Sequence, residues 1–193
     1  MPALEMLVAE MLAIHFCSDL EESLRVLADL TAEAEARVQA RHFIIAEDAV
    51  RVFWVNPVAD LRAMNLLESC GGRLCGSDFM FTHALDLIPE DLPPLDALAR
   101  TALADPMVGP ARDRVRRIIA ECRRRGAEAV VVARIPGASH CPWEAAQIRG
   151  EVHAQTGLPA VELEIPPVCD ALLPALRTRL EAVIEIAEGR RGS

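Results

Sequence analysis

The segment AVVVARIPGASHCPW, residues 129–143, contains the clearest structural signal in the chain. A run of small and β-branched apolar residues extends to Arg134 and predicts a buried strand. A loop rich in Pro, Gly and Ser follows, and Pro142 is typical of the first turn of a helix. Open α/β proteins place their reactive groups where a strand passes through a loop into a helix. Cys141 lies at such a junction, so it is the first candidate for a functional residue.

Three further strands are predicted, and all four alternate with helices. The apolar and β-branched segments are VRVFWV at 50–55, the weaker RLCG at 73–76, and AVELEI at 160–165. The last of these alternates apolar residues with Glu162 and Glu164, which indicates an edge strand or a partly wetted face. Helices are predicted over residues 60–69, 95–104, 111–125, 142–155 and 170–188. This alternation predicts the α/β class, as a small parallel four-stranded sandwich of Rossmann or flavodoxin type.

A helical N-terminal arm is predicted before the sheet, with helices over residues 2–15 and 18–41. Ser18 and Glu21 have the spacing of a capping box for the second helix. The apolar stripe of that helix consists of Leu20, Leu24, Leu27 and Leu30. If this stripe is exposed, we expect the chain to form oligomers through the arm.

The predicted organisation is a helical arm over residues 1–49, an α/β domain over 50–189 and a tail over 190–193. A hydrophobic content of 52% is enough for a well-filled core, and a net charge of −9 argues against extensive nucleic-acid binding. No apolar run approaches the roughly 20 residues of a membrane span. The first residues include acids but no early Lys or Arg, which is atypical of a signal peptide. We therefore expect a cytoplasmic protein with neither a membrane nor a nucleic acid as partner.

Polar and thiol side chains follow each predicted strand. In a parallel sheet the carboxyl ends of the strands share one rim, where ligands bind. The residues predicted on that rim are Asn56 after the first strand, Ser77 and Asp78 after the second, Ser139, His140 and Cys141 after the third, and Pro166, Pro167 and Cys169 after the fourth. Neither a P-loop nor a GxGxxG fingerprint is present, so the rim matches no standard nucleotide motif.

Three interpretations of Cys141 follow from its position. The N-terminus of the following helix would favour a thiolate of low pKa, or the thiolate would ligate an iron–sulfur cluster or zinc. A buried small residue is the structural alternative. A Cys–His hydrolase is disfavoured because adjacent residues such as His140 usually point their side chains apart.

Seven arginines in and around residues 111–125 predict a solvated helix face, with a phosphate-binding or docking surface as the alternative. They are Arg112, Arg114, Arg116, Arg117, Arg123, Arg124 and Arg125.

Several segments, taken in order, resemble one known family. They are RVFWVNPVADL at 51–61, GGR at 71–73, FMFTHAL at 79–85, DPM at 105–107, the arginine-rich helix, a strand followed by a cysteine, and LRTRLEAVIE at 176–185. From about Val50 onward this order resembles the 2-hydroxyacyl-CoA dehydratase / benzoyl-CoA reductase family. The family's TRxEAxxE-like helix corresponds to Thr178, Arg179, Glu181, Ala182 and Glu185.

The resemblance implies a [4Fe–4S] cluster between two stacked α/β domains. Three cysteines hold such a cluster, two from the first domain and one from the second, and the second-domain cysteine corresponds to Cys141. Cys75 and Cys169 are further candidates, although no part of the motif assigns them that role. Because one cysteine cannot hold a cluster, a partner subunit or a second copy of the chain would supply the other domain.

The activity that the resemblance implies is one-electron reduction of an acyl-CoA thioester by an iron–sulfur enzyme. A separate ATP-hydrolysing activator protein would supply the electron. The enzyme would then be a lyase that dehydrates a 2-hydroxyacyl-CoA, or an aryl-CoA reductase. The alternative is a binding or assembly module of the same fold that has no cluster, and a third hypothesis is a small thiol enzyme that uses Cys141.

Overall fold

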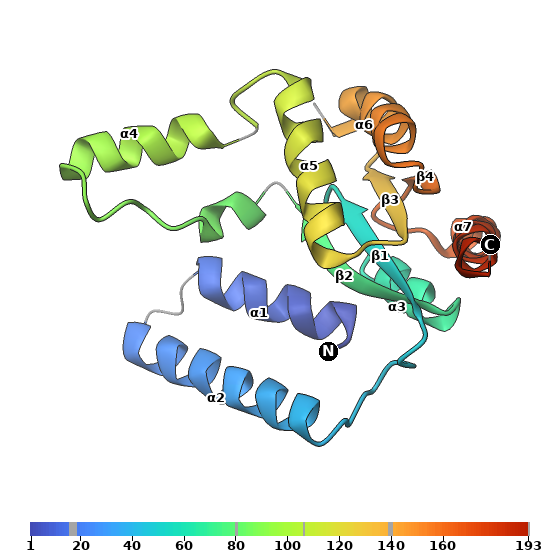
Figure 1. Ribbon diagram of the computed structural model, residues 1–193, viewed down its shortest axis with the longest axis horizontal. Helices are drawn as coiled ribbons and strands as arrows, with labels where there is room; N and C mark the ends of the chain where they lie inside the picture. The colour runs from blue at the N-terminus through green and yellow to red at the C-terminus, as the bar shows by residue number, and fades with distance from the viewer. Residues whose placement is uncertain (16–18, 80, 106, 139–140, 193) are drawn as a thin grey trace.

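A parallel four-stranded sheet forms the centre of the protein (Figure 1). The computed structural model describes residues 1–15, 19–79, 81–105, 107–138 and 141–192, without the side chains of His15, Cys141 and Pro142. The strands are β1 (Val50–Val55), β2 (Gly72–Asp78), β3 (Ala129–Arg134) and β4 (Ala160–Glu164), in the order β2-β1-β3-β4. Every neighbouring pair is parallel. The predicted α/β class is therefore confirmed, and β4 is an edge strand.

The seven described helices are α1 (Ala3–His15), α2 (Leu20–Gln39), α3 (Arg62–Ser69), α4 (Pro94–Ala104), α5 (Ala111–Arg125), α6 (Cys141–Thr156) and α7 (Leu173–Arg191), with 3-10 turns η1 (Thr82–Leu85) and η2 (Asp170–Leu172). Five of the seven described helices cover the two faces of this sheet, while α2 and α4 lie away from it (Figure 1). A left-handed Gly126, with φ of 62°, ends α5 as its C-cap.

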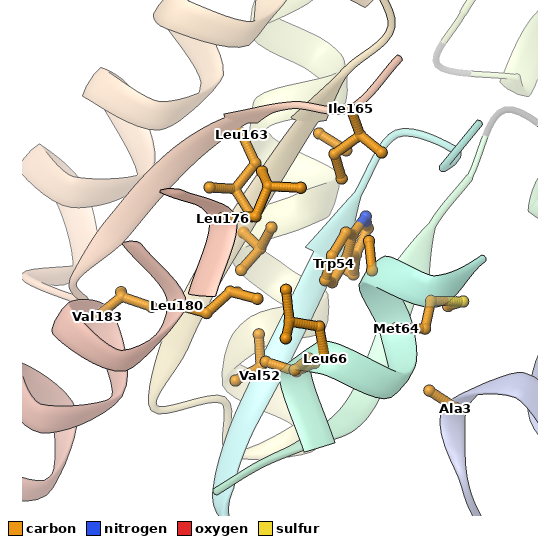
Figure 2. Close-up of a cluster of buried hydrophobic side chains, with 14 of the residues drawn as sticks. Ala3, Val52, Trp54, Met64, Leu66, Leu163, Ile165, Leu176, Leu180 and Val183 are labelled. Carbon is orange, nitrogen blue, oxygen red and sulfur yellow. The ribbon is translucent and has the colours of Figure 1, made fainter. Parts of the chain in front are cut away.

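Alternate residues of the strands form two separate cores. Val52 and Trp54 of β1 pack with α1, α3 and α7 on one face, as Figure 2 shows. Phe53 and Val55 point to the other face and pack against α5 and α6. Strands buried on both faces explain the continuous apolar runs of β1 and β3.

Several predicted boundaries differ from the structure. β2 continues to Asp78, so Ser77 and Asp78 are the last residues of the strand rather than part of the loop after it. α7 continues to Arg191, so part of the predicted tail is helical. The N-cap of α2 is Asp19, whose Oδ1 accepts a hydrogen bond from Glu22 N at 3.0 Å, and the predicted cap Ser18 lies outside the described residues.

The N-terminal arm is attached to the sheet through α1. Ala3 and Leu7 of α1 are buried in the first core, and Ala3 N donates to Glu68 Oε1. α2 lies beyond α1, away from the sheet (Figure 1). The side chains of Leu20 and Leu24 on α2 are 63% and 58% exposed. Part of the predicted stripe of α2 therefore has no apolar cover within the described chain.

α4 stands away from the sheet (Figure 1), and its leucines are exposed. Leu95 and Leu103 on this helix are 81% and 76% exposed, and Leu87 just before it is 94% exposed. Of the helices that the structure describes, none is long and apolar enough to cross a bilayer.

Candidate functional site

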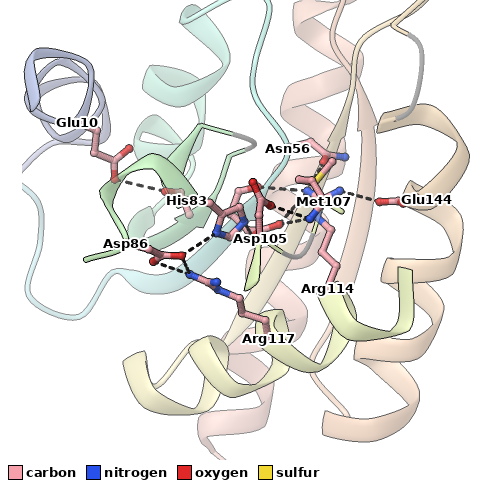
Figure 3. Close-up of polar contacts among 11 residues, drawn as sticks. Glu10, Asn56, His83, Asp86, Asp105, Met107, Arg114, Arg117 and Glu144 are labelled. Carbon is pink, nitrogen blue, oxygen red and sulfur yellow. Dashed lines mark hydrogen bonds and ion pairs between the residues drawn. The ribbon is translucent and has the colours of Figure 1, made fainter. Parts of the chain in front are cut away.

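A buried polar network occupies the carboxyl end of the sheet between β1 and β3. The chain passes from β1 to β2 on one side and later returns to β3 on the other side. Ligands of open α/β sheets bind at such a switch in strand order. The side chains that meet here come from the residue after β1 and from β2, α5 and α6 (Figure 3). The network is therefore where the fold predicts a functional site.

Arg114 of α5 is the centre of the network, and its side chain is only 1% exposed. Its Nε lies 2.9 Å and its Nη2 2.8 Å from Asp78 Oδ2. Nη2 also donates to Asn56 Oδ1 at 2.7 Å, and Nη1 donates to Glu144 Oε2 at 2.9 Å. A buried guanidinium is tolerated only when its N–H groups are paired in this way. The prediction that Arg114 belongs to a solvated helix face is therefore wrong.

Asn56 joins the network to the main chain of β3. Its Nδ2 donates to the carbonyl of Ala133 at 2.9 Å, while its Oδ1 accepts from Arg114. The backbone of Asn56 is left-handed, with φ of 68°. Asn tolerates this conformation better than most residues with a side chain, because its short amide interacts with nearby main chain. This geometry aims the amide of Asn56 at the gap between β1 and β3.

A second group of side chains extends the network on the β2 side. His83, whose side chain is 4% exposed, has Nε2 3.2 Å from Asp78 Oδ1 and Nδ1 3.7 Å from Asp86 Oδ2. Arg117 Nη2 donates to both oxygens of Asp86 at 2.8 and 2.7 Å. Within the described part of the chain, neither ring nitrogen of His83 makes a well-aligned hydrogen bond. The two ring nitrogens of His83 therefore remain available for hydrogen bonds.

Glu144 connects the network to the start of α6. It lies in the first turn of that helix, three residues after Cys141, and binds Arg114. The structure therefore brings the helix that begins at Cys141 to the carboxyl end of β1 and β2. The side chain of Cys141, and all of Ser139 and His140, lie outside the described residues.

Cys169 lies in a different environment near the same rim. It is buried in the core on the α3 and α7 face, and its Sγ lies 3.0 Å from Asp60 Oδ2. Arg62 holds the pKa of Asp60 far below its ordinary value by donating hydrogen bonds to it. Burial, followed by the bond to the Asp60 carboxylate, raises the pKa of Cys169 to about 11. The thiol is thus a protonated donor near neutral pH.

The candidate cluster ligand Cys75 and the predicted rim residue Ser77 both lie outside the network. Cys75 packs against the second core on the opposite face of the sheet from Cys169, and burial raises its pKa to about 11. The hydroxyl of Ser77 faces Glu10 of α1, with 3.5 Å between Oγ and Oε1. Among the described residues, no three His, Cys, Asp or Glu side chains are arranged to hold a metal ion.

The structure thus unites two of the predicted rim residues, Asn56 and Asp78, and adds three that the sequence did not indicate as site residues. Arg114, His83 and Glu144 lie on helical segments, where nothing in the local pattern separates them from surface residues.

Comparison with protein families identifies the chain. The sequence profile described as 2-hydroxyglutaryl-CoA dehydratase, D-component, matches residues 1–187. The chain belongs to this family. The match includes α1 and α2, whereas the motifs that carry the sequence resemblance begin only at about Val50. No curated protein sequence gives a significant match to the chain.

Proposed function

We propose that this chain is a component of an enzyme that dehydrates a 2-hydroxyacyl-CoA thioester in the cytoplasm, with Cys141 as one ligand of a [4Fe–4S] cluster. The observation that supports this most strongly is the contact of Arg114 with Glu144. Family membership indicates a dehydratase component. The contact places the helix that begins at Cys141 at the switch point, where an α/β sheet binds its ligands.

The described thiols of this chain do not complete a cluster site. Cys75 and Cys169 pack on opposite faces of the sheet, so these two thiols are not placed to ligate one cluster together. The remaining ligands would therefore come from a partner subunit or from a second copy of the chain.

The chain's own residues would orient and stabilise the site. A bound cluster would supply the one-electron reduction of the thioester, with a separate ATP-dependent activator protein as the electron source. Arg114 and Asn56 hold the ends of β1, β2 and β3 together around the first turn of α6. Because this network is buried and fully paired around Arg114, we assign it to fixing geometry rather than to attacking the substrate.

A binding or assembly module without a cluster is the second candidate. The uncovered leucines of α2 and α4 favour it, since exposed apolar side chains gathered on one segment mark interaction surfaces. The same surfaces are also required if a partner supplies cluster ligands, so they do not separate the two functions by themselves.

Iron and acid-labile sulfide on protein purified without oxygen would test the proposal. The chain would be compared with Cys141→Ser and with Cys70→Ser, a control at a half-exposed thiol at the end of α3. We expect iron and sulfide in the original chain and in Cys70→Ser, and their loss in Cys141→Ser. Absence of iron from the original chain, or equal iron in Cys141→Ser, would reject Cys141 as a ligand and favour the binding module.

A further inference from the structure

A basic groove runs along the open edge of the sheet, and its composition differs from that of the Arg114 network. It lies over the beginning of β4, between the second half of α6 and α7, and has a volume of about 550 Å³. Figure 1 shows α6 and α7 on the two sides of this edge. The side chains that matter for binding are Arg149, His153, Val161, Arg179, Ile186 and Arg190.

The charge of the groove is the opposite of the charge of the whole protein. Three arginines line it and no Asp or Glu does, although the net charge of the chain is −9. Among the described residues, no carboxylate lies within ion-pair distance of Arg149, Arg179 or Arg190. The nearby carboxylates of Glu162 and Glu164 are both paired with Arg134. The three guanidinium charges are therefore not neutralised by the described part of the chain.

Arg179 covers the edge of β4, and Arg190 covers the turn that precedes this strand. Arg179 Nη1 donates to the carbonyl of Glu162 at 3.1 Å, and Arg190 Nη1 donates to the carbonyl of Gly157. Such contacts protect an edge strand against pairing with another chain. The Arg179 contact also occupies an acceptor of β4 that an added strand would need, which argues against a peptide as the occupant of the groove.

Edge protection does not account for Arg149. Its guanidinium makes no hydrogen bond or ion pair with any described residue, yet it lines the same groove from the α6 side. His153, one turn later on α6, uses Nδ1 to contact the carbonyl of Leu158 at 2.9 Å, which leaves its Nε2 available. The groove thus presents polar groups that are not needed to hold the fold together.

We propose that this groove binds a nucleoside phosphate. Guanidinium groups form paired, charge-assisted hydrogen bonds with phosphate oxygens. The apolar part of the lining, which includes Val161, Val183 and Ile186, offers a surface for a flat base. The volume lies within the range of small-molecule sites, about 300–1,000 Å³. This proposal does not depend on a cluster at Cys141.

Two kinds of ligand carry a base and phosphate groups of this type. One is a free nucleotide, and the other is the nucleotide end of a coenzyme A thioester. Calorimetric titration with ADP, coenzyme A and pyrophosphate would identify the source. Tighter binding of coenzyme A than of ADP would identify the coenzyme, and equal binding would identify the nucleotide unit alone. Either result supports the proposed site, provided that substitution of Arg149 weakens the binding.

Arg149→Gln tests that dependence, because the substitution removes a charge without removing any described contact of the folded chain. We expect about a tenfold loss of affinity for ADP, which corresponds to about 1.4 kcal/mol. Arg123→Gln is the control, since Arg123 is an exposed arginine on α5. No binding of ADP or coenzyme A at millimolar concentration, or unchanged affinity in Arg149→Gln, would overturn the proposal. Pyrophosphate that binds as tightly as ADP would also overturn it, by showing a site for adventitious anions only.

Discussion

Arg114 and Arg149 occur on neighbouring helices that cover the same face of the sheet, yet their surroundings are opposite. Arg114 is buried and makes contacts with Asp78, Asn56 and Glu144. Arg149 is exposed, lines an open groove and has no described partner. The same side chain therefore serves to fix the fold in one place and remains available to a ligand in the other.

This difference shows how a charged residue is assigned a role. Burial makes pairing obligatory, because an unpaired guanidinium in the interior has lost its water without compensation. At the surface, an unpaired arginine costs little in stability, so it persists if it has another use. Substitutions at the two sites should consequently affect different measurements: the free energy of unfolding at Arg114 and ligand affinity at Arg149.

The largest effect is expected from Arg114→Met. Removal of the guanidinium leaves Asp78 buried without its partner, which costs about 3–5 kcal/mol in the free energy of unfolding. Arg114→Lys keeps the charge but loses the forked geometry, so its stability should fall between those of the original chain and Arg114→Met. Urea denaturation measures both, with Arg149→Met as the control, expected within about 0.5 kcal/mol of the original chain. A loss below about 1 kcal/mol in Arg114→Met would contradict the role of the network, because it is typical of an ordinary substitution.

The next largest loss in the free energy of unfolding is expected from substitutions of Asn56. Asn56→Ala removes both side-chain hydrogen bonds and keeps a Cβ at a left-handed position, at a cost of about 2–3 kcal/mol. Asn56→Gly removes the same bonds but adopts φ of 68° freely, so it should be about 1 kcal/mol less destabilising than Asn56→Ala. Thermal and urea unfolding of the pair would separate backbone strain from hydrogen bonding. Equal stabilities would show that the φ angle has no cost.

Glu144→Gln should have a smaller effect. The side chain of Glu144 is 27% exposed, and Gln keeps an oxygen that accepts from Arg114. We expect a loss of about 1 kcal/mol, typical of a charge-assisted contact near the surface. Glu185→Gln is the control, because Glu185 is exposed on α7. A loss as large as that of Arg114→Met would mean that Glu144, rather than Asp78, is the principal partner of Arg114.

The smallest change in stability is expected for the partly exposed ion pair between Glu128 and Arg191. Arg191, together with the amide of Arg51, lowers the pKa of Glu128 from its ordinary 4.5 to about 2. Because the folded pKa is depressed, this stabilisation is present above the ordinary pKa of 4.5 and is lost as the pH falls toward 2. Glu128→Gln should therefore lower stability at about pH 6 but make little difference near the folded pKa of about 2. An equal difference at both pH values would exclude the ion pair as its cause.

The positions of the elements followed from local patterns. Val130 to Val132 are β-branched and apolar, as a strand buried on both faces requires, and Gly126 follows the helix that it ends. The alternation at Glu162 and Glu164 correctly indicated the edge of the sheet. Asn56 and Asp78 were predicted on the carboxyl rim because strand ends share that rim in any parallel sheet.

The sequence alone thus established the α/β class, the order of its elements and the rim on which Asn56 and Asp78 meet, because each depends on patterns within a few residues of one another. Only the folded chain distinguished Arg114 from the six arginines beside it, since Arg114 is 58 residues from Asn56 and 36 from Asp78. Local periodicity carries no information about such distant partners. The role of each arginine was therefore decided by what the fold brought, or did not bring, within reach of its guanidinium group.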